Sequence, residues 1–517
     1  MARAKSRHQS APDTPRPEGR RQPAWTIGLL LAVPALAVAA WFCFPREGAD
    51  PETPHPSGAN LSQKLAPIRI GRELELVDAL PIGTGSLADC SLLLVTLDTT
   101  RADRIGCYGN QEIETPTLDG IADDGALFSA ATAVAPTTLP AHASILTGLY
   151  PAHHGVRANG LFRLEDSHET LAERLRSEGF RTGAVVSAFV LASQFGLSQG
   201  FEQYEDDLSD ADDPAERHYR ARGADRTTDR AINWVRAVAQ ERFFLWVHYF
   251  DPHHDYSPPS PFAEKYAGNL YDGEIAYVDS ELKRLLASLD DLGLSERCLV
   301  VVVGDHGEGL GQHHEYTHAY LTYDSTLRVP LLMRCGSRLG GGVHCSRPVS
   351  QVDVMPTVLS LLGVRAGQPG DGTSLTEVQP EARPVFFESL AGALDYGWEP
   401  LIGARSGGTK CIRSSSPELY DLLHDPWEEN NLHSSEPAKA AEMEALLAGL
   451  FGPELELATR VTPTVHPSPG DLEDLQALGY LGGGAGNAAA SPSAAPPQEM
   501  IQLLNRGELA LAEKVPL

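Results

Sequence analysis

The chain has 517 residues, of which 42% are hydrophobic and 21% charged, so it is long and apolar enough to bury a sizeable core. Its formal net charge of −28 argues against a protein that binds duplex nucleic acid, because such a protein needs basic surface to neutralise phosphates. Acidic surfaces otherwise serve solubility, so the charge excludes little else.

The first predicted element is a transmembrane anchor at residues 24–45, preceded by a basic cytoplasmic tail at residues 1–23. Residues 25–44 carry no charge, and a run of this length at about 1.5 Å per residue spans a bilayer core of about 30 Å. Basic residues before the run predict a catalytic part on the extracytoplasmic side, periplasmic or extracellular. A cleaved signal peptide and a buried core helix are the alternatives. The bulky Trp41 and Phe42, where a small-residue cleavage site would lie, favour a retained anchor.

Residues 46–88 are rich in Pro, Gly and Ser and are predicted to form a linker. Beyond them, continuous apolar runs predict buried parallel strands, and helix-like stretches separate these runs. The predicted strands are residues 91–97, 181–186, 243–247 and 298–303, and the predicted helices include residues 169–178 and 274–290. This alternation predicts an α/β fold with a mostly parallel central sheet flanked by helices.

Polar side chains follow three of these predicted strands. Asp98 follows the first strand, His248 follows the third, and Asp305 and His306 follow the fourth. Ligands of open α/β sheets bind beyond the carboxyl ends of the strands. The four side chains are therefore expected to lie close together, although they are far apart in the sequence.

The pattern changes after about residue 370, where short predicted strands and a helix at residues 436–451 indicate a smaller α+β subdomain. A stretch of Gly, Ala, Ser and Pro follows, which is typical of a flexible linker. The predicted division is a catalytic domain at residues 89–370, a C-terminal subdomain at 371–455, a flexible linker at 456–497 and a short terminal helix at 498–517.

Seven cysteines are present, and Cys43 lies in the predicted anchor. No two form a CxxC pair, so the spacing of a zinc finger is absent. An exported domain would meet oxidising conditions, in which Cys335 and Cys345 could close a short loop. Buried free thiols are the alternative, and the sequence leaves both open.

Residues 135–155, APTTLPAHASILTGLYPAHHG, are predicted to form a loop that leads into a helix. Thr138 would lie at the amino end of this helix, where backbone N–H groups and the helix dipole favour an anion. A hydroxyl there can meet a phosphate or sulfate group. The alternative role for Thr138 is that of a plain helix N-cap.

Together with Asp98-Thr-Thr-Arg-Ala-Asp103 before it and Gly304-Asp-His-Gly-Glu308 after it, this segment resembles the sulfatase-like branch of the alkaline-phosphatase superfamily. The resemblance covers about residues 90–435. Several motifs in the same order are more specific than one short pattern. The further matching motifs are Gly179-Phe-Arg-Thr182, Arg328-Val-Pro330, Glu418-Leu-Tyr-Asp421 and Asp425-Pro426. The resemblance implies a metal-dependent ester hydrolase.

The chain also departs from the formylglycine sulfatases of this branch. Those enzymes carry Cys or Ser in a Cys/Ser-x-Pro-x-Arg motif, whereas this chain has Thr138-Leu-Pro-Ala-His142, and Thr is not expected to become formylglycine. Their Lys-x-His pair corresponds to Ser187-Ala-Phe189. Their paired acids and their Asp-Asn metal pair correspond to Asp98-Thr99 and Asp305-His306. Each departure points away from a hydrated-aldehyde, calcium-type mechanism.

Two branches with a Thr nucleophile match better. Nucleotide pyrophosphatase/phosphodiesterases are similar in a Thr-x-Pro-x-His motif followed by Thr-Gly-x-Tyr-Pro-x-x-His-Gly, found here at residues 138–142 and 147–155. That resemblance implies Thr138 as the nucleophile and Asn159 as a donor to a non-bridging oxygen of the substrate.

Phosphoethanolamine transferases are similar in their Asp-His-Gly-Glu motif, here at residues 305–308, with a His further along at His318. They also share a His-x4-His pair followed by a Tyr, matched here by His248, His253 and Tyr256. By this resemblance, these residues would bind zinc and the phosphate of the substrate.

The residue types suit this chemistry. A Thr hydroxyl is a poor nucleophile near neutral pH, and coordination to a cation lowers its pKa. Asp98, Asp305 and His306, with Thr138 itself, would form a mixed oxygen and nitrogen site for a divalent metal, with zinc expected and manganese or calcium as alternatives. The remaining histidines, His248, His253 and His318, would bind a second ion or hold substrate oxygens. The expected path is a covalent Thr138 ester that water hydrolyses.

Neighbouring residues receive lesser roles. His142 and Arg101 are expected to orient or pack other groups, and Glu308 is expected to support a ligand rather than to react. Asp251 and Asp255 are alternative metal ligands. The adjacent histidines at positions 313 and 314 are interpreted as solvated loop residues.

The sequence thus predicts a metal-dependent hydrolase of phosphate mono- or diesters, acting on a small-molecule, lipid or glycan ester and held to a membrane by its N-terminal helix. A sulfatase or a phospho-group transferase is the alternative function. A membrane-tethered binding domain without activity is a third possibility. Metal content would distinguish this third possibility, because a decayed enzyme is expected to have lost its metal ligands.

Overall fold

The computed structural model describes residues 75–208, 221–378, 383–451, 464–465 and 467–477, all within one compact unit that begins at Gln63. Within these ranges, none of the helices combines the length and the apolar character that a membrane span requires. The predicted tail, anchor and terminal helix, at residues 1–23, 24–45 and 498–517, lie outside the described residues.

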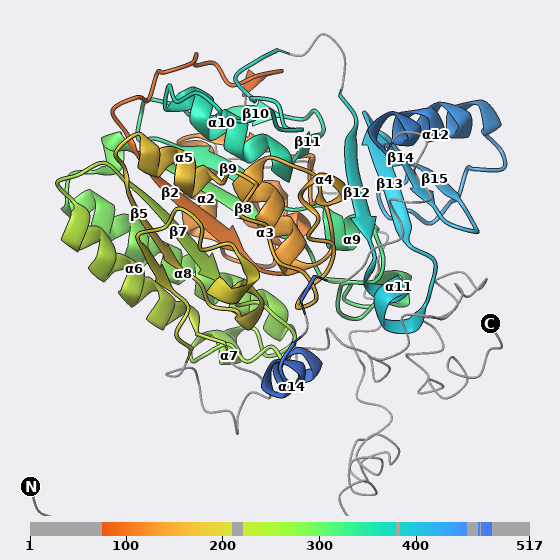
Figure 1. The fold of residues 1–517 in the computed structure, drawn as a ribbon, viewed down its shortest axis with the longest axis horizontal. Coiled ribbons are helices and arrows are strands. Elements are labelled where there is room, and N and C mark those ends of the chain that lie inside the picture. Colours follow the sequence, from red (N-terminus) through yellow and green to blue (C-terminus); the bar gives the residue numbers. More distant parts are fainter. Residues whose placement is uncertain (1–74, 209–220, 379–382, 452–463, 466, 478–517) are drawn as a thin grey trace, which may run out of the picture. The chain divides into compact units, whose positions relative to one another are not determined.

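A nine-stranded sheet forms the centre of the structure (Figure 1). All neighbouring strands are parallel except β9, which runs antiparallel to both of its neighbours. The sheet confirms the predicted mostly parallel α/β fold, including the four strands predicted from apolar runs. In spatial order its strands are β1 (Glu75–Leu76), β10 (Val343–Cys345), β3 (Ala126–Phe128), β9 (Leu331–Arg334), β8 (Cys298–Gly304), β2 (Ser91–Leu97), β7 (Phe243–Tyr249), β5 (Arg181–Val185) and β6 (Gln203–Glu205).

Helices cover both faces of this sheet. Successive residues of a strand point to opposite faces, so that Leu92 and Leu94 of β2 pack in one core while Leu93 and Val95 pack in the other. One face holds α3 (Thr138–Thr147), α5 (Leu171–Ser177) and α10 (Val354–Leu361), and the other holds α2 (Pro116–Asp123), α6 (Ala224–Val238) and α8 (Leu270–Asp291). Because both faces are covered, the central strands are fully buried, and their sequences are continuously apolar.

A second, antiparallel sheet confirms the predicted smaller α+β subdomain. Its core is formed by Ile402 and Leu419 of the sheet with Met443 and Leu447 of α12 (Pro437–Phe451). The strands follow one another as β12 (Val385–Ser389), β13 (Leu401–Ser406), β14 (Thr409–Arg413) and β15 (Glu418–Asp421).

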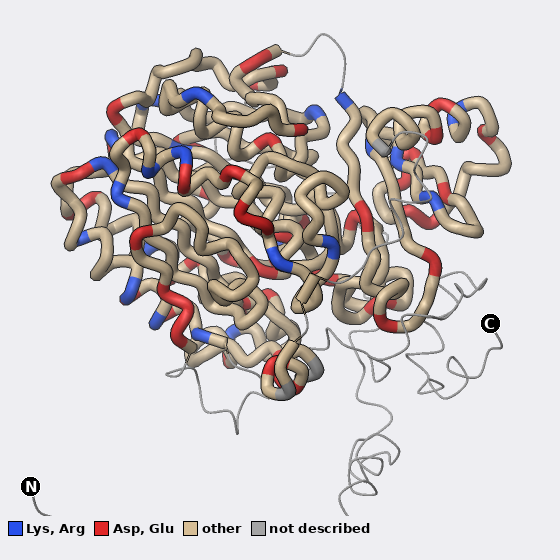
Figure 2. Tube along the Cα trace, in the orientation of Figure 1, with Lys and Arg blue, Asp and Glu red and all other residues tan. Residues whose placement is uncertain are grey.

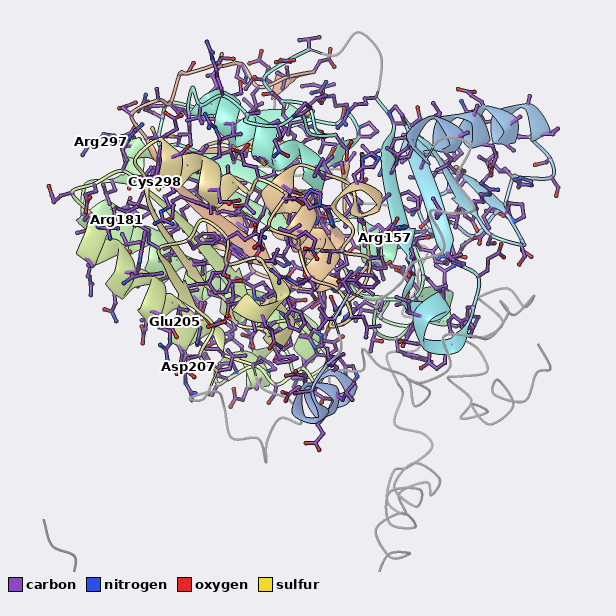
Figure 3. The ribbon with its side chains drawn as sticks, in the orientation of Figure 1. Arg157, Arg181, Glu205, Asp207, Arg297 and Cys298 are labelled. Carbon is purple, nitrogen blue, oxygen red and sulfur yellow. The ribbon has the colours of Figure 1, made fainter. Side chains whose placement is uncertain are left out.

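Buried ion pairs join this subdomain to the α/β part. Arg157, labelled beside β12 in Figure 3, donates from Nη2 to Glu388 Oε2 at 2.7 Å. Lys410 of β14 is fully buried, and its Nζ lies 2.8 Å from Asp324 Oδ1 and 2.7 Å from Glu428 Oε1. Breaking such a buried pair costs about 3–5 kcal/mol, so these contacts fix the subdomain beside the sheet.

The remaining short elements connect these layers. A two-stranded parallel sheet pairs β4 (Ala131–Thr132) with β11 (Val349–Ser350). The short helices are α4 (Pro151–His154), α7 (Phe262–Lys265), α9 (Asp324–Leu327), α11 (Ala391–Tyr396) and α14 (Pro469–Ala477).

Two elements lie inside segments that were predicted to be linkers. Strand β1, within residues 46–88, adds to the sheet beside β10. Helix α14, within residues 456–497, buries Leu475 completely against Gly160, where any Cβ atom would collide with the leucine side chain. Both predictions of irregular chain are therefore wrong at these elements, because tertiary packing and not local composition orders them.

Acidic and basic residues are interspersed along the traced chain in Figure 2. The acidic excess is thus spread over many elements, which suits the solubility role that the sequence suggested.

Candidate active site

The carboxyl ends of three adjacent strands bring the predicted site residues together. Strand β2 lies between β8 and β7, and Asp98 follows β2 directly. His248 lies near the end of β7, while Asp305 and His306 follow β8. All four side chains are completely buried. The expectation that these distant residues meet at one edge of the sheet is confirmed.

Thr138 joins this cluster as the first residue of α3. Its Oγ1 lies 3.3 Å from His306 Nε2, and the same nitrogen lies 3.7 Å from Asp98 Oδ1 and 3.5 Å from Asp305 Oδ2. The N-cap of α3 is Thr137 and not Thr138, so the plain N-cap alternative does not describe this hydroxyl.

Hydrogen bonds assign the tautomer of His306. Its Nδ1 lies 3.0 Å from the carbonyl oxygen of Gly307, which can only accept, so Nδ1 carries the proton. Burial, the largest cause, lowers the pKa of His306 well below its usual value, and the ring is therefore neutral near pH 7. The lone pair of Nε2 thus points toward Thr138 and the two carboxylates, as a metal ligand requires.

The two aspartates each present one carboxylate oxygen without a hydrogen bond in the described part of the chain, namely Asp98 Oδ1 and Asp305 Oδ2. Asp305 Oδ1, by contrast, accepts from the backbone N–H of Thr99 at 3.1 Å and of His306 at 2.6 Å. Burial raises the pKa of both aspartates, and each is raised further by neighbouring carboxylates. Buried, unpaired carboxylate oxygens around a nitrogen lone pair are the environment that a cation would satisfy.

His248 has a different hydrogen-bond pattern from His306. Its Nδ1 accepts from the backbone N–H of Ser187 at 3.3 Å, so the proton of the neutral ring lies on Nε2. Burial lowers the pKa of His248 to about 3, which keeps the ring neutral. Nε2 then donates to Asp98 Oδ2 at 3.2 Å. This pattern favours His248 as the residue that orients Asp98, and its role as a direct ligand stays a prediction.

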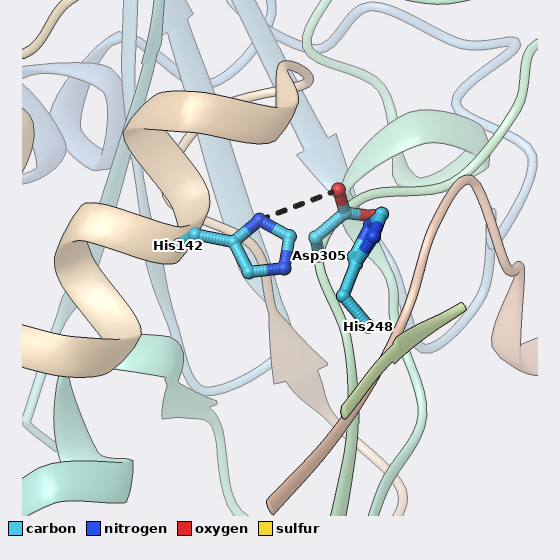
Figure 4. A group of neighbouring side chains, drawn as sticks. All are labelled: His142, His248 and Asp305. Atoms are coloured by element: carbon cyan, nitrogen blue, oxygen red, sulfur yellow. Dashed lines mark ion pairs between the residues drawn. The ribbon is translucent and has the colours of Figure 1, made fainter. Parts of the chain in front are cut away.

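His142 lies beside Asp305 and His248 in Figure 4, with Nδ1 at 3.8 Å from Asp305 Oδ2. Both of its ring nitrogens are already engaged, because Nδ1 donates to the Thr138 carbonyl at 2.8 Å and Nε2 accepts from Thr96 Oγ1 at 2.9 Å. His142 therefore has no lone pair to offer a metal. Its contact with the Thr138 carbonyl supports the predicted orienting role.

Asn159 reaches the amino end of α3. Its Oδ1 accepts from the backbone N–H of Leu139 at 2.8 Å, so the opposite group is the NH2 donor. That Nδ2 is buried and has no hydrogen-bond partner among the described residues. Because Asn159 is held by Leu139, the residue that follows Thr138, its buried and unused NH2 donor fits the predicted contact with a substrate oxygen.

A second set of rings adjoins the first. The His318 ring lies 4.4 Å from that of His306 and 5.1 Å from that of His253, measured between centroids. His318 Nδ1 donates to Glu308 Oε1 at 3.1 Å, and Tyr256 donates to Glu308 Oε2 at 2.9 Å. Glu308 thus orients His318 with Nε2 toward the site, in agreement with the supporting role expected from the sequence.

The ligand sets that the described residues offer favour a single ion. Two groups of three His or Asp side chains have ligand atoms within 4.8 Å of one another. Neither of them includes His253 or His318. The group of Asp98, Asp305 and His306 fits a divalent cation best, because the other group depends on His142.

Five further residues were assigned from the sequence. The guanidinium of Arg101 donates to the Glu308 carbonyl at 2.9 Å, which fits an orienting role. Asp251 is buried, while 44% of the Asp255 side chain is exposed. Of the two adjacent histidines interpreted as solvated, His314 is exposed as expected, whereas the interpretation is wrong for His313, whose ring stacks on Tyr323 with 3.5 Å between centroids.

Sequence reasoning missed two residues that support this edge of the sheet. Gln351 Nε2 donates to the carbonyls of Gly304 at 2.8 Å and Asp305 at 2.6 Å, which fixes the end of β8. Thr99 has a φ of 45°, rare for a residue with a branched side chain, and its carbonyl accepts from Tyr271 at 2.6 Å. No local pattern distinguishes either residue, although Thr99 follows a predicted ligand directly.

Comparison with known proteins agrees with this geometry. A family model described as Sulfatase matches residues 91–364, more than half of the chain. An uncharacterized sulfatase, YidJ of Escherichia coli K12, is 25% identical over 414 residues, covering 66% of this chain and 82% of the relative. The multifunctional alkaline phosphatase superfamily protein PehA of Trinickia caryophylli is 23% identical, covering 74% of this chain and 98% of the relative.

Among solved structures, the phosphonate monoester hydrolase of Agrobacterium radiobacter superposes with a TM-score of 0.58 at 21% identity, covering 72% of this chain and 96% of that one. At this identity the likeness shows the fold. The match of the family model shows more: the chain belongs to the sulfatase family of the alkaline-phosphatase superfamily, a family of hydrolytic, metal-dependent enzymes.

Proposed function

We propose that this protein hydrolyses phosphate mono- or diesters and that Thr138 is its nucleophile. The observation that supports this most is the position of Thr138 Oγ1, at the amino end of α3 and 3.3 Å from the lone-pair nitrogen of His306. Asp98 and Asp305 present their unpaired oxygens to the same nitrogen. A hydroxyl in this place is next to a cation site and to a helix end that favours anions.

Asp98, Asp305 and His306 would hold the divalent cation, which supplies positive charge that lowers the pKa of the Thr138 hydroxyl. In the first step, Thr138 Oγ1 forms a bond to phosphorus as the ester P–O bond breaks. The alcohol leaves with a proton, and Asn159 Nδ2 donates to a non-bridging oxygen whose charge grows in the transition state. His253 and His318 would hold the remaining oxygens. Water then attacks phosphorus and releases Thr138.

Zinc or manganese is the proposed metal. The donor set combines an imidazole nitrogen with two carboxylates and a hydroxyl, whereas calcium prefers oxygen ligands throughout. A single ion is proposed, because the compact ligand groups among the described residues exclude His253 and His318.

Sulfate ester hydrolysis is the second candidate, and the match to the sulfatase family model favours it. The phosphate proposal is preferred because a Thr at the nucleophile position has no route to the formylglycine of the formylglycine sulfatases. Transfer of the phospho-group to an acceptor other than water would use the same first step.

We also propose that a retained helix at residues 24–45 holds the catalytic domain on the extracytoplasmic side of a membrane, where a small-molecule, lipid or glycan ester would be the substrate. The charge pattern of the sequence supports this proposal. Attachment of a fluorescent protein to either end, with protease protection of intact cells or vesicles, tests the orientation.

The enzymatic proposal is tested on the purified chain after chelation, with zinc, manganese or calcium restored separately. Para-nitrophenyl phosphate, bis-para-nitrophenyl phosphate and para-nitrophenyl sulfate report the three ester classes. We expect phosphate ester turnover with zinc or manganese and at least about a hundredfold loss in Thr138→Ala. Thr147→Ala, at the other end of α3, is the matched control. Sulfate turnover well above phosphate turnover would establish the second candidate instead. A protein without affinity for any of the metals would indicate a binding domain.

A further inference from the structure

The end of the sheet opposite the candidate active site carries a close pair of thiols. Cys90 lies immediately before β2, and Cys335 lies immediately after β9, which runs in the opposite direction. Strand β8 lies between them in the sheet and begins at Cys298, labelled with Arg297 at the edge of the domain in Figure 3. The two cysteines therefore meet across the amino end of β8.

The Sγ atoms of Cys90 and Cys335 are 3.5 Å apart, and both residues are fully buried. This is van der Waals contact, and a disulfide needs about 2.05 Å between the sulfurs, so the two Sγ atoms must approach by about 1.5 Å to form the bond. No other pair of the cysteines that the structure describes has a sulfur–sulfur contact at this range. The sequence offered Cys335 and Cys345 as partners, but the contact of Cys335 is with Cys90.

The surroundings make Cys90 the more reactive of the two thiols. Arg338 Nη1 donates to Cys90 Sγ at 3.1 Å, and the same guanidinium is fixed by Asp89 Oδ1 at 2.8 Å and by the Ser86 carbonyl at 2.9 Å. The hydrogen bond from Cys335, assisted by the charge of Arg338, lowers the pKa of the Cys90 thiol. A cationic neighbour and a thiol donor are the features that make a cysteine nucleophilic.

We propose that Cys90 and Cys335 are a redox-active pair that forms a structural disulfide when the chain meets a small disulfide oxidant such as oxidised glutathione. The Cys90 thiolate attacks one sulfur of the oxidant, forming a mixed disulfide and releasing one thiolate. Cys335 then loses its proton and attacks Cys90 Sγ, which forms the Cys90–Cys335 bond and releases the second thiolate. Two electrons and two protons pass to the oxidant, which leaves as two thiols.

The proposed disulfide would cross-link the sheet covalently and would leave the active site unchanged. The two cysteines are separated by 245 positions in the chain, so the bond would close a loop that contains most of the central sheet. Cross-links that close long loops restrict the unfolded chain most. Along β2, Cys90 lies about 26 Å from Asp98, given about 3.3 Å per residue over eight residues. Neither thiol touches a residue of the proposed mechanism, so the inference does not depend on the proposed function.

The test uses the purified full chain, equilibrated with oxidised or with reduced glutathione through partial denaturation and refolding, because both thiols are buried. The protein is then denatured in N-ethylmaleimide, and modified cysteines are counted by mass spectrometry. We expect all seven cysteines to react after the reducing treatment, and two fewer after the oxidising treatment, with a Cys90–Cys335 peptide in the unreduced digest. The thermal midpoint should rise by several degrees on oxidation and return when dithiothreitol is added.

Two variants sharpen the result. Cys90→Ser should retain every remaining thiol after oxidation, whereas the control Cys411→Ser, in the C-terminal subdomain, should still lose two. The peptide map of the unmutated chain needs no variant, so it remains decisive if Cys90→Ser fails to fold. Equal thiol counts in the two buffers would overturn the proposal, and so would a Cys335–Cys345 peptide.

Discussion

Replacing Asp305 by Asn should stabilise the metal-free protein and destabilise the protein in zinc. Asp98 and Asp305 present ligand oxygens within 4.8 Å of each other, and at an effective dielectric of about 20 two charges at that distance repel by at least about 3 kcal/mol. The introduced amide would keep the acceptor that Thr99 and His306 use, and its NH2 would occupy the place of the unpaired Oδ2 beside His306 Nε2. In chelator, the substitution therefore removes repulsion without removing a hydrogen bond.

In zinc the effect of Asp305→Asn on stability reverses. A ligand that binds only the folded protein stabilises it by about 4 kcal/mol at a thousand times its Kd, and Asp305→Asn removes a charged ligand of the proposed site. Thermal unfolding in chelator and in zinc, for the wild type and the variant, gives the four midpoints required. The control is Asp229→Asn, at an exposed partner of Arg284. It should shift the thermal midpoint by no more than about a degree, both in chelator and in zinc.

The pH dependence adds a check on the cause. The folded pKa values of Asp98 and Asp305 are raised by burial, so the metal-free folded state binds more protons than the unfolded state. The stability of the metal-free wild type should therefore rise as pH falls from about 8 toward about 5, and the advantage of Asp305→Asn should shrink. A variant that is less stable than the wild type in chelator at about pH 8 as well as in zinc would refute the assignment of a cation site.

Three further predictions concern individual side chains. Asn159→Ala should lower kcat for phosphate esters by about 10²–10³-fold with little effect on KM, which steady-state kinetics would show, whereas a purely structural Asn159 would lower the thermal midpoint and leave kcat unchanged. Glu308→Gln should lower activity toward phosphate esters by about 10–100-fold, because His318, which would hold substrate oxygens, loses its carboxylate partner, and equal turnover by both proteins would contradict this. Lys410→Met should cost about 3–5 kcal/mol in urea unfolding, since it removes the buried cation that Asp324 and Glu428 share, whereas Lys439→Met at an exposed pair should cost almost nothing.

The sequence predicts the architecture of this protein well where local pattern and global packing agree. Continuous apolar runs mark β2, β7 and β8, because strands covered on both faces need no polar alternation. The rule that ligands bind at carboxyl ends of strands then brings Asp98, Asp305 and His306 together before any coordinates are known. The polar residues at the strand ends are thus the part of this site that is most easily predicted from the sequence.

Other features depend on side-chain geometry that no local pattern encodes. The resemblance groups His248 with the metal ligands, but the backbone N–H of Ser187 determines its tautomer, and that contact joins β7 to the segment that follows β5. The contact between Cys90 and Cys335 likewise depends on the sheet order, which places β8 between their strands. Strand β1 and helix α14 were missed because a short element that packs on an existing surface needs little intrinsic propensity.

The most direct test of the central claim is a search for the covalent intermediate on Thr138. The purified enzyme, loaded with zinc or manganese, is mixed with a radiolabelled phosphate ester and quenched in acid, in which phosphothreonine survives. Peptide mapping should then find the label on Thr138 in the wild type and none in Thr138→Ala. Label on another residue, or steady turnover by Thr138→Ala without any labelled protein, would contradict the assignment of Thr138 as the nucleophile.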